Sequence, residues 1–260
     1  LGLTLEPVPW SADGLYVSHK DQLGSHALHH AGAFYMQEAS AQVVTASLEP
    51  QPGERVLDLC AAPGGKSTHL AALMNNTGLL ICNEPVPNRA RVLLENLERI
   101  GSSAVVTQED PQRLAAAWGA FFDRVLVDAP CSGEGMFRKS LAAVRDWSPA
   151  HVLACSKRQM QILESAAELL KVGGTLVYST CTFAPEENEH AIARFLEMHP
   201  EFALEVIAGL PAGIDGIGSR LMPHLVRGEG HFVARLRKIS GEDSDAPLEQ
   251  GSTAPFQRGH

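Results

Sequence analysis

The chain has 260 residues, of which 45% are apolar and 20% are charged. This composition is typical of a globular protein and excludes a wholly disordered chain. No stretch approaches the ~20 uninterrupted apolar residues of a membrane span, and no charged-then-apolar signal segment opens the sequence. We therefore expect a soluble, cytoplasmic protein. The first residue is Leu1 rather than methionine, which is compatible with a piece of a longer protein.

The formal net charge is −9 at pH 7, which argues against nucleic-acid binding through overall charge. The charge is unevenly distributed along the chain. Residues 138–158 hold five cations against one acid, and residues 220–238 also hold five against one. These two basic segments are either solvated surfaces or contacts for a local anionic partner, and charge alone leaves both interpretations open.

Five cysteines occur in the chain, and none of them forms a C-x-x-C pair. This spacing does not predict a zinc site, and an odd count does not predict a disulfide framework. We expect reduced thiols and no bound metal. Cys82 and Cys155 are interpreted as small buried hydrophobic residues, whereas Cys60, Cys131 and Cys181 lie in loops considered below.

Strand and helix signals alternate through the middle of the chain. Ser148 and Pro149 are typical of a helix N-cap and first helical position, and Gly173-Gly174 is expected to end that long helix. The alternation predicts an α/β fold with a doubly wound, mostly parallel sheet. In chain order the expected elements are a strand at 56–60, a helix at 66–75, a strand at 79–83, a helix at 87–100, strands at 104–107 and 124–128, a helix at 149–170, a strand at 175–179, a helix at 186–198 and a strand at 232–236.

Three regions are expected. Residues 1–50 lack the alternation and are interpreted as an N-terminal arm packed on the core. Residues 51–239 carry the sheet domain. Residues 240–260 are polar and contain glycine and proline, which predicts a tail or linker.

The first predicted strand leads into DLCAAPGGKS, residues 58–67. In such a sheet, ligands bind beyond the carboxyl ends of the strands. Small residues let a ligand approach the backbone, and the following helix presents its N-terminus. Gly65-Lys66-Ser67 resembles the end of a phosphate-binding loop, but Cys60 stands where that pattern requires glycine. The loop predicts a cofactor site in preference to a plain tight turn.

Acidic residues follow the next two predicted strands. Glu84 lies about 20 residues beyond the first loop, at the position that binds ribose hydroxyls in nucleoside-binding sheets. Asp110 follows the third strand and is a candidate partner for an adenine amine.

Two thiols occur at the ends of the fourth and fifth predicted strands. Cys131 belongs to DAPCSG, which begins with Asp128, and Cys181 belongs to STCT. A thiolate nucleophile needs a partly exposed, polar position of this kind. Both cysteines are therefore candidates for covalent chemistry.

These motifs resemble the Nol1/Nop2/Sun family of RNA (cytosine-5) methyltransferases, which use S-adenosylmethionine, and most closely its bacterial ribosomal-RNA members. The similar segments are DLCAAPGGKS, DAPCSG, YSTCT followed by PEENE, FYMQEAS in the arm, and RLMPHLVRGEGHFVARL near the end. The resemblance covers about residues 14–237. It implies a Rossmann-like methyltransferase domain over 51–239 and an RNA partner, in particular ribosomal RNA.

The resemblance also implies roles for single residues. Cys181 is the expected nucleophile, Asp128 the hydrogen-bonding partner of the pyrimidine edge near N3, and Cys131 the group that assists release. Pro130 is expected to shape the base pocket, Lys66 to face cofactor or RNA, and Arg145 and Lys157 of the first basic segment to contact RNA, with 220–238 as a second contact. The expected cofactor-binding residues are Cys60, Ala61, Ala62, Pro63, Gly64, Gly65, Lys66, Glu84, Arg89, Asp110 and Asp128.

Four alternatives stay open at this point. A DNA cytosine-5 methyltransferase would use Cys131 as the nucleophile and leave Cys181 without a role. A small-molecule methyltransferase leaves both thiols unexplained. A transfer-RNA methyltransferase fits the same motifs. A non-catalytic RNA-binding, ribosome-assembly protein on this fold also fits, although the presence of both cysteines and Asp128 gives no sign of lost activity.

Overall fold

The structure is a computed structural model that describes residues 3–18 and 23–241. Of the predicted tail, only Ser240 and Gly241 are among the described residues; the remainder lies outside them.

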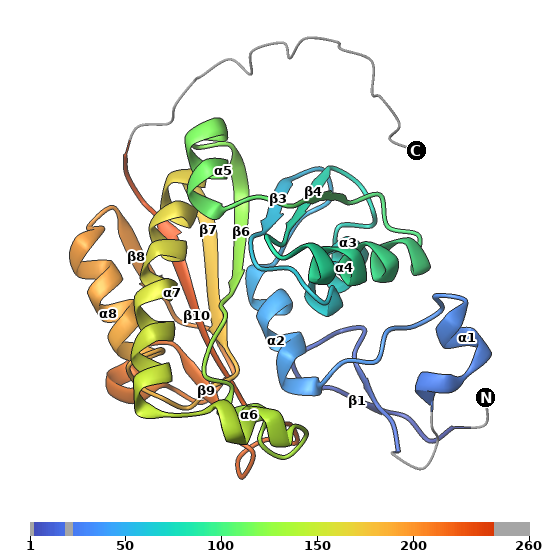
Figure 1. The fold of residues 1–260 in the computed structure, drawn as a ribbon. Coiled ribbons are helices and arrows are strands. Elements are labelled where there is room, and N and C mark those ends of the chain that lie inside the picture. The colour runs from blue at the N-terminus through green and yellow to red at the C-terminus, as the bar shows by residue number, and fades with distance from the viewer. Residues whose placement is uncertain (1–2, 19–22, 242–260) are drawn as a thin grey trace, which may run out of the picture.

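One mixed sheet of eight strands forms the centre of the protein (Figure 1). Its order is β5-β4-β3-β6-β7-β10-β8, and β9 also pairs with β10. The first five of these strands run parallel, whereas β10 is antiparallel to each of its neighbours. The strands are β3 (Arg55–Asp58), β4 (Leu79–Asn83), β5 (Val105–Thr107), β6 (Phe122–Asp128), β7 (Leu170–Thr180), β8 (Phe202–Glu205), β9 (Ser219–Leu221) and β10 (His231–Lys238).

The parallel part of the sheet is doubly wound, which confirms the predicted fold class. The chain runs outward from β3 to β4 and β5, then returns to the other side of β3 to form β6 and β7. The strand order therefore reverses between β3 and β6. A crevice opens at the carboxyl ends of the strands at such a reversal, and it is the expected place for a ligand.

Helices cover both faces of the sheet (Figure 1). The longest, α7, packs on β6 and β7 and lies beside α5 and α8, whereas α2 packs on β6, β7 and β10 on the other face, beside α3. The helices are α1 (Ala27–His30), α2 (Ala39–Leu48), α3 (Gly65–Leu73), α4 (Pro87–Arg99), α5 (Pro111–Trp118), α6 (Leu141–Asp146), α7 (Pro149–Leu169) and α8 (Glu189–Met198), with short 3-10 turns at Leu23–Ser25, Glu134–Met136 and Ile214–Gly216.

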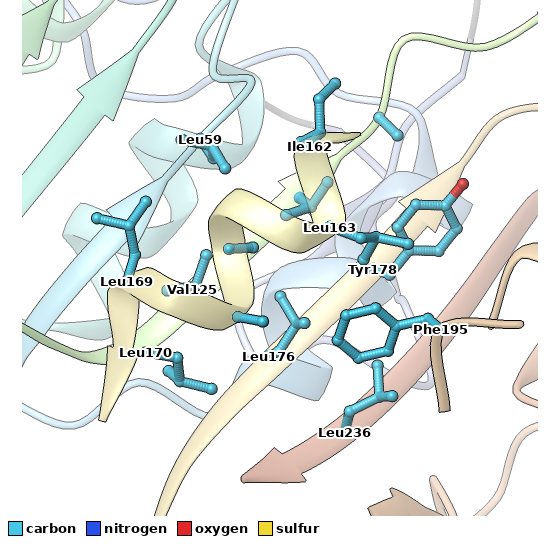
Figure 2. Close-up of a cluster of buried hydrophobic side chains, with 14 of the residues drawn as sticks. Leu59, Val125, Ile162, Leu163, Leu169, Leu170, Leu176, Tyr178, Phe195 and Leu236 are labelled. Carbon is cyan, nitrogen blue, oxygen red and sulfur yellow. The ribbon is translucent and has the colours of Figure 1, made fainter. Parts of the chain in front are cut away.

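Each face of the sheet has its own hydrophobic core. Figure 2 shows the core beneath α7, where Leu163 meets Leu176 and Tyr178 of β7 and Phe195 of α8. Burial of one such side chain stabilises the fold by roughly 1.5–3 kcal/mol. Because neighbouring residues of a strand point to opposite faces, Val177 belongs to the core under α2.

The arm is more structured than its sequence suggested. Besides a small sheet of β1 (Glu6–Pro7) and β2 (Leu15–Tyr16), it contains the whole of α2, whose Val44 and Leu48 are fully buried. Trp10 fixes the preceding segment, since its indole N–H donates to the Ala39 carbonyl at 2.7 Å. The arm therefore contributes one layer of the core.

One sequence prediction about the long helix is wrong. Gly173 and Gly174 do not end α7, which stops at Leu169 with Leu170 already in extended conformation. The two glycines lie within β7, where a Cβ on Gly174 would lie 2.7 Å from the Leu170 side chain. Gly174 is thus required because the Leu170 side chain occupies the space of a Cβ at the irregular start of β7, and not because a helix ends there.

Candidate active site

An open cavity of about 600 Å³ lies at the reversal between β3 and β6. All four loops selected from the sequence contribute to it, because the carboxyl ends of parallel strands meet at one edge of the sheet. The predicted residues that line it are Cys60, Ala62, Glu84, Arg89, Asp110, Asp128, Pro130, Cys131 and Cys181.

The remaining predicted residues lie outside the cavity lining. Ala61, Pro63 and Gly64 belong to the turn between β3 and α3, and Gly65 and Lys66 are the first two residues of α3. Gly64 has a φ of 109°, a conformation that favours glycine. Arg145 and Lys157 are exposed on α6 and α7, close in sequence to Asp146 and Arg158, which do line the cavity.

The turn after β3 is held from both of its ends. Ser67 Oγ of α3 donates to Asp58 Oδ2 of β3 at 2.7 Å, while the second oxygen of this fully buried carboxyl has no hydrogen-bond partner among the described residues. Burial raises the pKa of Asp58 to about 7 despite the bond from Ser67. An acid of this kind is neutral in part near physiological pH.

The end of β4 offers a second buried carboxylate. Glu84 is only 2% exposed, and its Oε1 accepts the Val86 N–H at 2.9 Å. Its Oε2 lies 3.1 Å from Arg89 Nη1, and Arg89 Nη2 donates to the Ala62 carbonyl at 3.1 Å. The acid and the turn are thereby fixed together. A carboxylate at a strand end facing a tight turn of small residues fits a nucleoside cofactor.

Asp128, which lines the cavity at the end of β6, forms an ion pair with Lys66. Lys66 Nζ donates to Asp128 Oδ2 at 2.7 Å, and Ser179 Oγ donates to Asp128 Oδ1 at 2.7 Å. Burial, the largest single influence, raises the pKa of Asp128, but the Lys66 charge, His231 and the hydrogen bonds from Lys66 and Ser179 together lower it overall. Burial likewise opposes the charge on Lys66, yet Asp128 raises the pKa of the lysine overall. Both groups are therefore ionised at neutral pH.

The two candidate thiols are direct neighbours, with 3.3 Å between Cys131 Sγ and Cys181 Sγ. The hydrogen bond from Cys131 lowers the pKa of Cys181, assisted by Lys66 and opposed by burial and Asp128. The same bond, with burial, raises the pKa of Cys131 well above its usual value. Cys181 is consequently the more acidic thiol, and Cys131 retains the proton. A thiol of lowered pKa reaches the reactive thiolate form more readily, so Cys181 stays the predicted nucleophile.

A buried polar network that the sequence analysis did not identify fixes the two cysteine loops. Glu187 accepts the Ser132 N–H at 3.0 Å and the Gln159 side-chain amide at 2.8 Å. Ser132 Oγ lies 2.8 Å from Thr182 Oγ1 on the other loop. Tyr178 donates its hydroxyl to the Glu187 carbonyl at 2.6 Å. The acidic run PEENE, which begins three residues after STCT, was the available sequence signal for this anchor.

The cations of the two basic segments differ in their partners, although Arg138 and Lys139 of the first segment form ion pairs with Glu229 of the second. Arg145, Lys157 and Arg158 are exposed and form no ion pair within the described ranges 3–18 and 23–241. The cations of 220–238, in contrast, are used inside the protein: Arg220 pairs with Glu189, Arg227 with Glu6, Arg235 with Glu49 and Glu205, Arg237 with Glu205, and Lys238 donates to two backbone carbonyls. The RNA contact by 220–238 stays a prediction, although the cations of this segment already have partners within the protein.

Cys82 and Cys155 are buried, as predicted, and Cys60 is half-buried beside the cavity. In the part of the chain that the structure describes, no group of three or more His, Cys, Asp or Glu side chains is placed to hold a metal ion. Within the same residues, none of the helices has the length and apolar character to cross a membrane.

Comparison with known proteins identifies the family. The family model described as "16S rRNA methyltransferase RsmB/F" matches residues 45–237. The chain belongs to this family. A second model, the N-terminal domain of 16S rRNA methyltransferase RsmF, matches residues 2–39. The Nol1/Nop2/Sun resemblance seen in the motifs is thereby confirmed.

Members of the RsmB/F family from several bacteria are similar over almost the whole chain. Ribosomal RNA small subunit methyltransferase F of Klebsiella pneumoniae (strain 342) is 40% identical over 98% of this chain and 56% of its own length. The protein of the same name from Vibrio vulnificus (strain YJ016) is 39% identical over 99% of this chain and 57% of its own length. The chain thus spans a little over half the length of these relatives.

Solved structures show the same fold. A methyltransferase homolog protein from Pyrococcus horikoshii is 33% identical, with a TM-score of 0.78, over 91% of this chain and 79% of that protein. NSun6 from Pyrococcus horikoshii, solved with SFG, is 32% identical, with a TM-score of 0.77, over 85% of this chain and 57% of that protein. The architecture of the RsmB/F core is therefore shared well beyond the bacterial relatives.

Proposed function

We propose that this protein transfers a methyl group from S-adenosylmethionine to carbon 5 of a cytosine in ribosomal RNA. The observation that supports this most is the pair Cys131 and Cys181, 3.3 Å apart at one edge of the cavity and beside the Lys66–Asp128 ion pair. The names of the relatives, ribosomal RNA small subunit methyltransferase F, support the RNA class.

The β4 side of the cavity fits the cofactor. When bound, S-adenosylmethionine supplies a methyl group activated on a sulfonium. Cys60, Ala62, Glu84, Arg89 and Asp110 line this side and are the residues proposed to hold it. A neighbour of the same fold was solved with SFG, an S-adenosylmethionine analogue, which supports the same choice.

Covalent catalysis by Cys181 follows from the acidity of its thiol. Carbon 5 of cytosine is a poor nucleophile. Addition of the Cys181 thiolate to carbon 6 forms an S–C bond and shifts the ring electrons toward N3, so that carbon 5 becomes nucleophilic like that of an enamine. After methylation, carbon 5 loses its proton to water in the open cavity, and the electron pair left on carbon 5 expels the Cys181 thiolate from carbon 6, which restores the aromatic ring. Cys131 is proposed to assist this release.

The Lys66–Asp128 pair is proposed to manage charge at the pyrimidine edge. An ionised Asp128 accepts a hydrogen bond from the exocyclic amine of cytosine, whereas negative charge that develops near N3 needs a cation or a proton. Lys66, held 2.7 Å from Asp128, supplies that positive charge. Pro130 lines the cavity beside Asp128 and is proposed to shape the base pocket.

RNA is proposed to enter across α6 and the start of α7. Arg145 and Lys157 are exposed there without ion-pair partners in the described chain, and Trp147, two residues after Arg145, is also partly exposed. Cations that follow a phosphate backbone together with an aromatic side chain are typical of single-strand binding. A target base must also leave its stack, at a cost of a few kcal/mol that unpaired RNA minimises.

The test is bisulfite mapping of ribosomal and transfer RNA incubated with the protein and S-adenosylmethionine. New 5-methylcytosine in ribosomal RNA with the wild type, and none with Cys181→Ala, is expected. New 5-methylcytosine in transfer RNA alone would favour the transfer-RNA alternative. RNA that binds but is never methylated would favour a non-catalytic assembly protein.

We also propose that the chain divides into an N-terminal arm (1–50), a methyltransferase domain (51–239) and a tail (240–260).

A further inference from the structure

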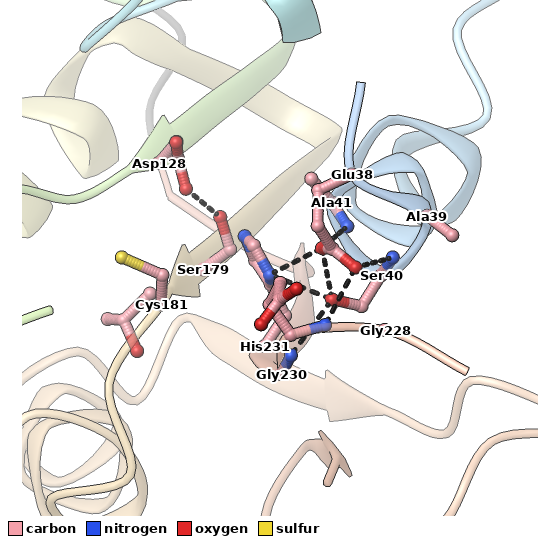
Figure 3. Close-up of polar contacts among 12 residues, drawn as sticks. Glu38, Ala39, Ser40, Ala41, Asp128, Ser179, Cys181, Gly228, Gly230 and His231 are labelled. Atoms are coloured by element: carbon pink, nitrogen blue, oxygen red, sulfur yellow. Dashed lines mark hydrogen bonds and ion pairs between the residues drawn. The ribbon is translucent and has the colours of Figure 1, made fainter. Parts of the chain in front are cut away.

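A buried polar cluster outside the reaction described above joins the arm to the active site. His231, the first residue of β10, is 7% exposed. Its Nδ1 lies 3.2 Å from Ser40 Oγ and 3.7 Å from Glu38 Oε2, both at the start of α2. Figure 3 shows the imidazole between this pair and the Ser179 side chain. The chemistry of methyl transfer makes no direct use of His231, so its burial calls for another role.

Glu38 and Ser40 form a rigid support for the imidazole. The Glu38 carboxylate accepts the backbone N–H groups of Ser40 at 2.9 Å, Ala41 at 3.0 Å and Glu229 at 2.8 Å. Ser40 donates its hydroxyl to the same carboxylate and accepts the Gly230 N–H at 3.2 Å. A carboxylate at a helix N-terminus with three amide donors is strongly held. The segment that leads into β10 is thereby fixed to the arm.

Strand register places His231 beside the residues that hold Asp128. In the antiparallel ladder of β10 and β7, Val233 is opposite Ser179 and Phe232 is opposite Thr180. Because side chains alternate between the two faces, His231 shares the face of Val233 and Ser179. Asp128 and Ser179 are opposite each other in the β6–β7 ladder, and Ser179 Oγ donates to Asp128 Oδ1. One face of three adjacent strands thus carries Asp128, Ser179 and His231.

We propose that His231 is a positioning residue for the methyl transfer: held by Ser40 and Glu38 of the arm, it keeps the Ser179 hydroxyl on Asp128, so that the carboxylate meets the cytosine edge in one orientation. This inference rests on the proposed function. It gives the arm a part in the reaction, since the support for a residue beside the catalytic carboxylate comes from residues 38–41.

The charges around His231 agree with such a role. The groups that face it are Glu38 on α2, Asp128 on β6 and Lys66 on α3. Burial, followed by Lys66, lowers the pKa of His231 to about 4, although Asp128 and Glu38 oppose this shift. The imidazole is therefore neutral at physiological pH. A neutral imidazole can keep the Ser40 and Ser179 hydroxyl groups in position without adding a charge beside the Lys66–Asp128 pair.

The test compares His231→Phe, which keeps a ring but removes both nitrogens, with His231→Asn, whose amide can still meet Ser40. His199→Phe on the segment after α8 is the matched control, since its imidazole is also partly buried, stacked on Phe195 and paired with Glu201. We expect His231→Phe to lower kcat by about tenfold to a hundredfold at an unchanged Kd for S-adenosylmethionine. His231→Asn is expected to recover most of the rate, and His199→Phe to retain it.

The pH profile separates positioning from general destabilisation. With the Ser179 bond loosened, the pKa of Asp128 rises, so the acid limb of kcat in His231→Phe is expected to move toward neutral pH. Wild-type kcat and an unmoved acid limb in His231→Phe would overturn the inference. An equal loss of rate in His199→Phe would also overturn it, because the effect would then be structural.

Alkylation of Cys181 by iodoacetamide, located by mass spectrometry, tests the effect of His231 on Asp128 without RNA. If Asp128 loses the hydrogen bond from Ser179, its attraction to Lys66 becomes stronger, and Lys66 then stabilises the Cys181 thiolate less. The pH midpoint for Cys181 alkylation is therefore expected to rise in His231→Phe. A midpoint equal to that of the wild type contradicts the inference. A wild type that shows this coupling but never methylates RNA contradicts the proposed function instead, so the two failures are distinguishable.

Discussion

Two chemically identical thiols differ at this site because of their neighbours. Cys181 accepts a hydrogen bond from Cys131 and lies near Lys66, and both lower the pKa of its thiol. The pKa of Cys131 is raised instead, because Cys181 and burial both oppose a negative charge on its sulfur. The sequence motifs place each cysteine at a strand end, but they do not state the distance between the sulfur atoms. The 3.3 Å separation depends on Glu187 and Ser132, which lie 55 residues apart. Long-range contacts of this kind are not encoded in any local pattern.

Asp58 gives a prediction at the same scale. Burial raises the pKa of this carboxyl to about 7 in the fold, against 3.8 for the free side chain. A carboxyl with a raised pKa binds more protons in the folded state, so the free energy of unfolding falls as pH rises from about 4 to about 7. Asp58→Asn removes this pH-dependent decrease in the free energy of unfolding, because the amide does not titrate.

Thermal unfolding of the two proteins across pH measures the effect. The Tm of Asp58→Asn relative to the wild type is expected to rise between pH 5 and pH 8, by several degrees for a shift of this size. A constant difference in Tm over that range would show that Asp58 titrates normally in the fold.

At the scale of elements, apolar runs and their spacing predicted the parallel strands correctly, because a strand buried on both faces needs a continuous apolar sequence. The same reasoning missed α2, whose sequence ASAQVVTASL has many small and polar residues and little helical periodicity. It also missed α5, α6 and the short strands β8 and β9. These elements take their conformation from packing against the sheet more than from local preference.

Leu48 tests whether α2 is part of the core. Its side chain is fully buried among Val43, Val56 and other residues of the second core. Leu48→Ala leaves a cavity and is expected to lower the free energy of unfolding by about 2–5 kcal/mol. Denaturant unfolding measures this loss.

Leu153→Ala is the matched control, because Leu153 lies on α7 with 55% of its surface exposed. It is expected to change the free energy of unfolding by less than about 0.5 kcal/mol. If Leu48→Ala were equally mild, the arm could not be a layer of the core.

For the whole molecule, net charge is a poor guide to partners. The chain carries a formal charge of −9, yet the surface beside the cavity has exposed cations at Arg145, Lys157 and Arg158, which form no ion pair with any residue that the structure describes. The second basic segment is equally positive in sequence, but its cations form internal ion pairs and backbone hydrogen bonds. Sequence alone could not distinguish the two segments, because the acidic partners of 220–238 lie as far away as Glu6 and Glu49.

The salt dependence of RNA binding tests this distinction. Arg145→Gln with Lys157→Gln is expected to weaken binding to single-stranded RNA and to reduce the slope of log K against log salt by about 1 to 2. S-adenosylmethionine binding is expected to stay unchanged. Arg91→Gln with Arg194→Gln, two exposed cations on α4 and α8, gives the same change in net charge as a control.

The control pair is expected to leave the salt slope as it is in the wild type. An equal reduction in both double variants would mean that overall charge, and not the surface at α6 and α7, governs RNA binding.

The central claim assigns different tasks to the two thiols, and trapping of a protein–RNA adduct tests it most directly. Cys131→Ala, Cys181→Ala and the double variant are incubated with S-adenosylmethionine and ribosomal RNA, then separated by denaturing gel electrophoresis. Cys131→Ala is expected to accumulate an RNA adduct, because addition through Cys181 proceeds while release stalls. Cys181→Ala and the double variant are expected to form none. An adduct in Cys181→Ala and none in Cys131→Ala would contradict the assignment.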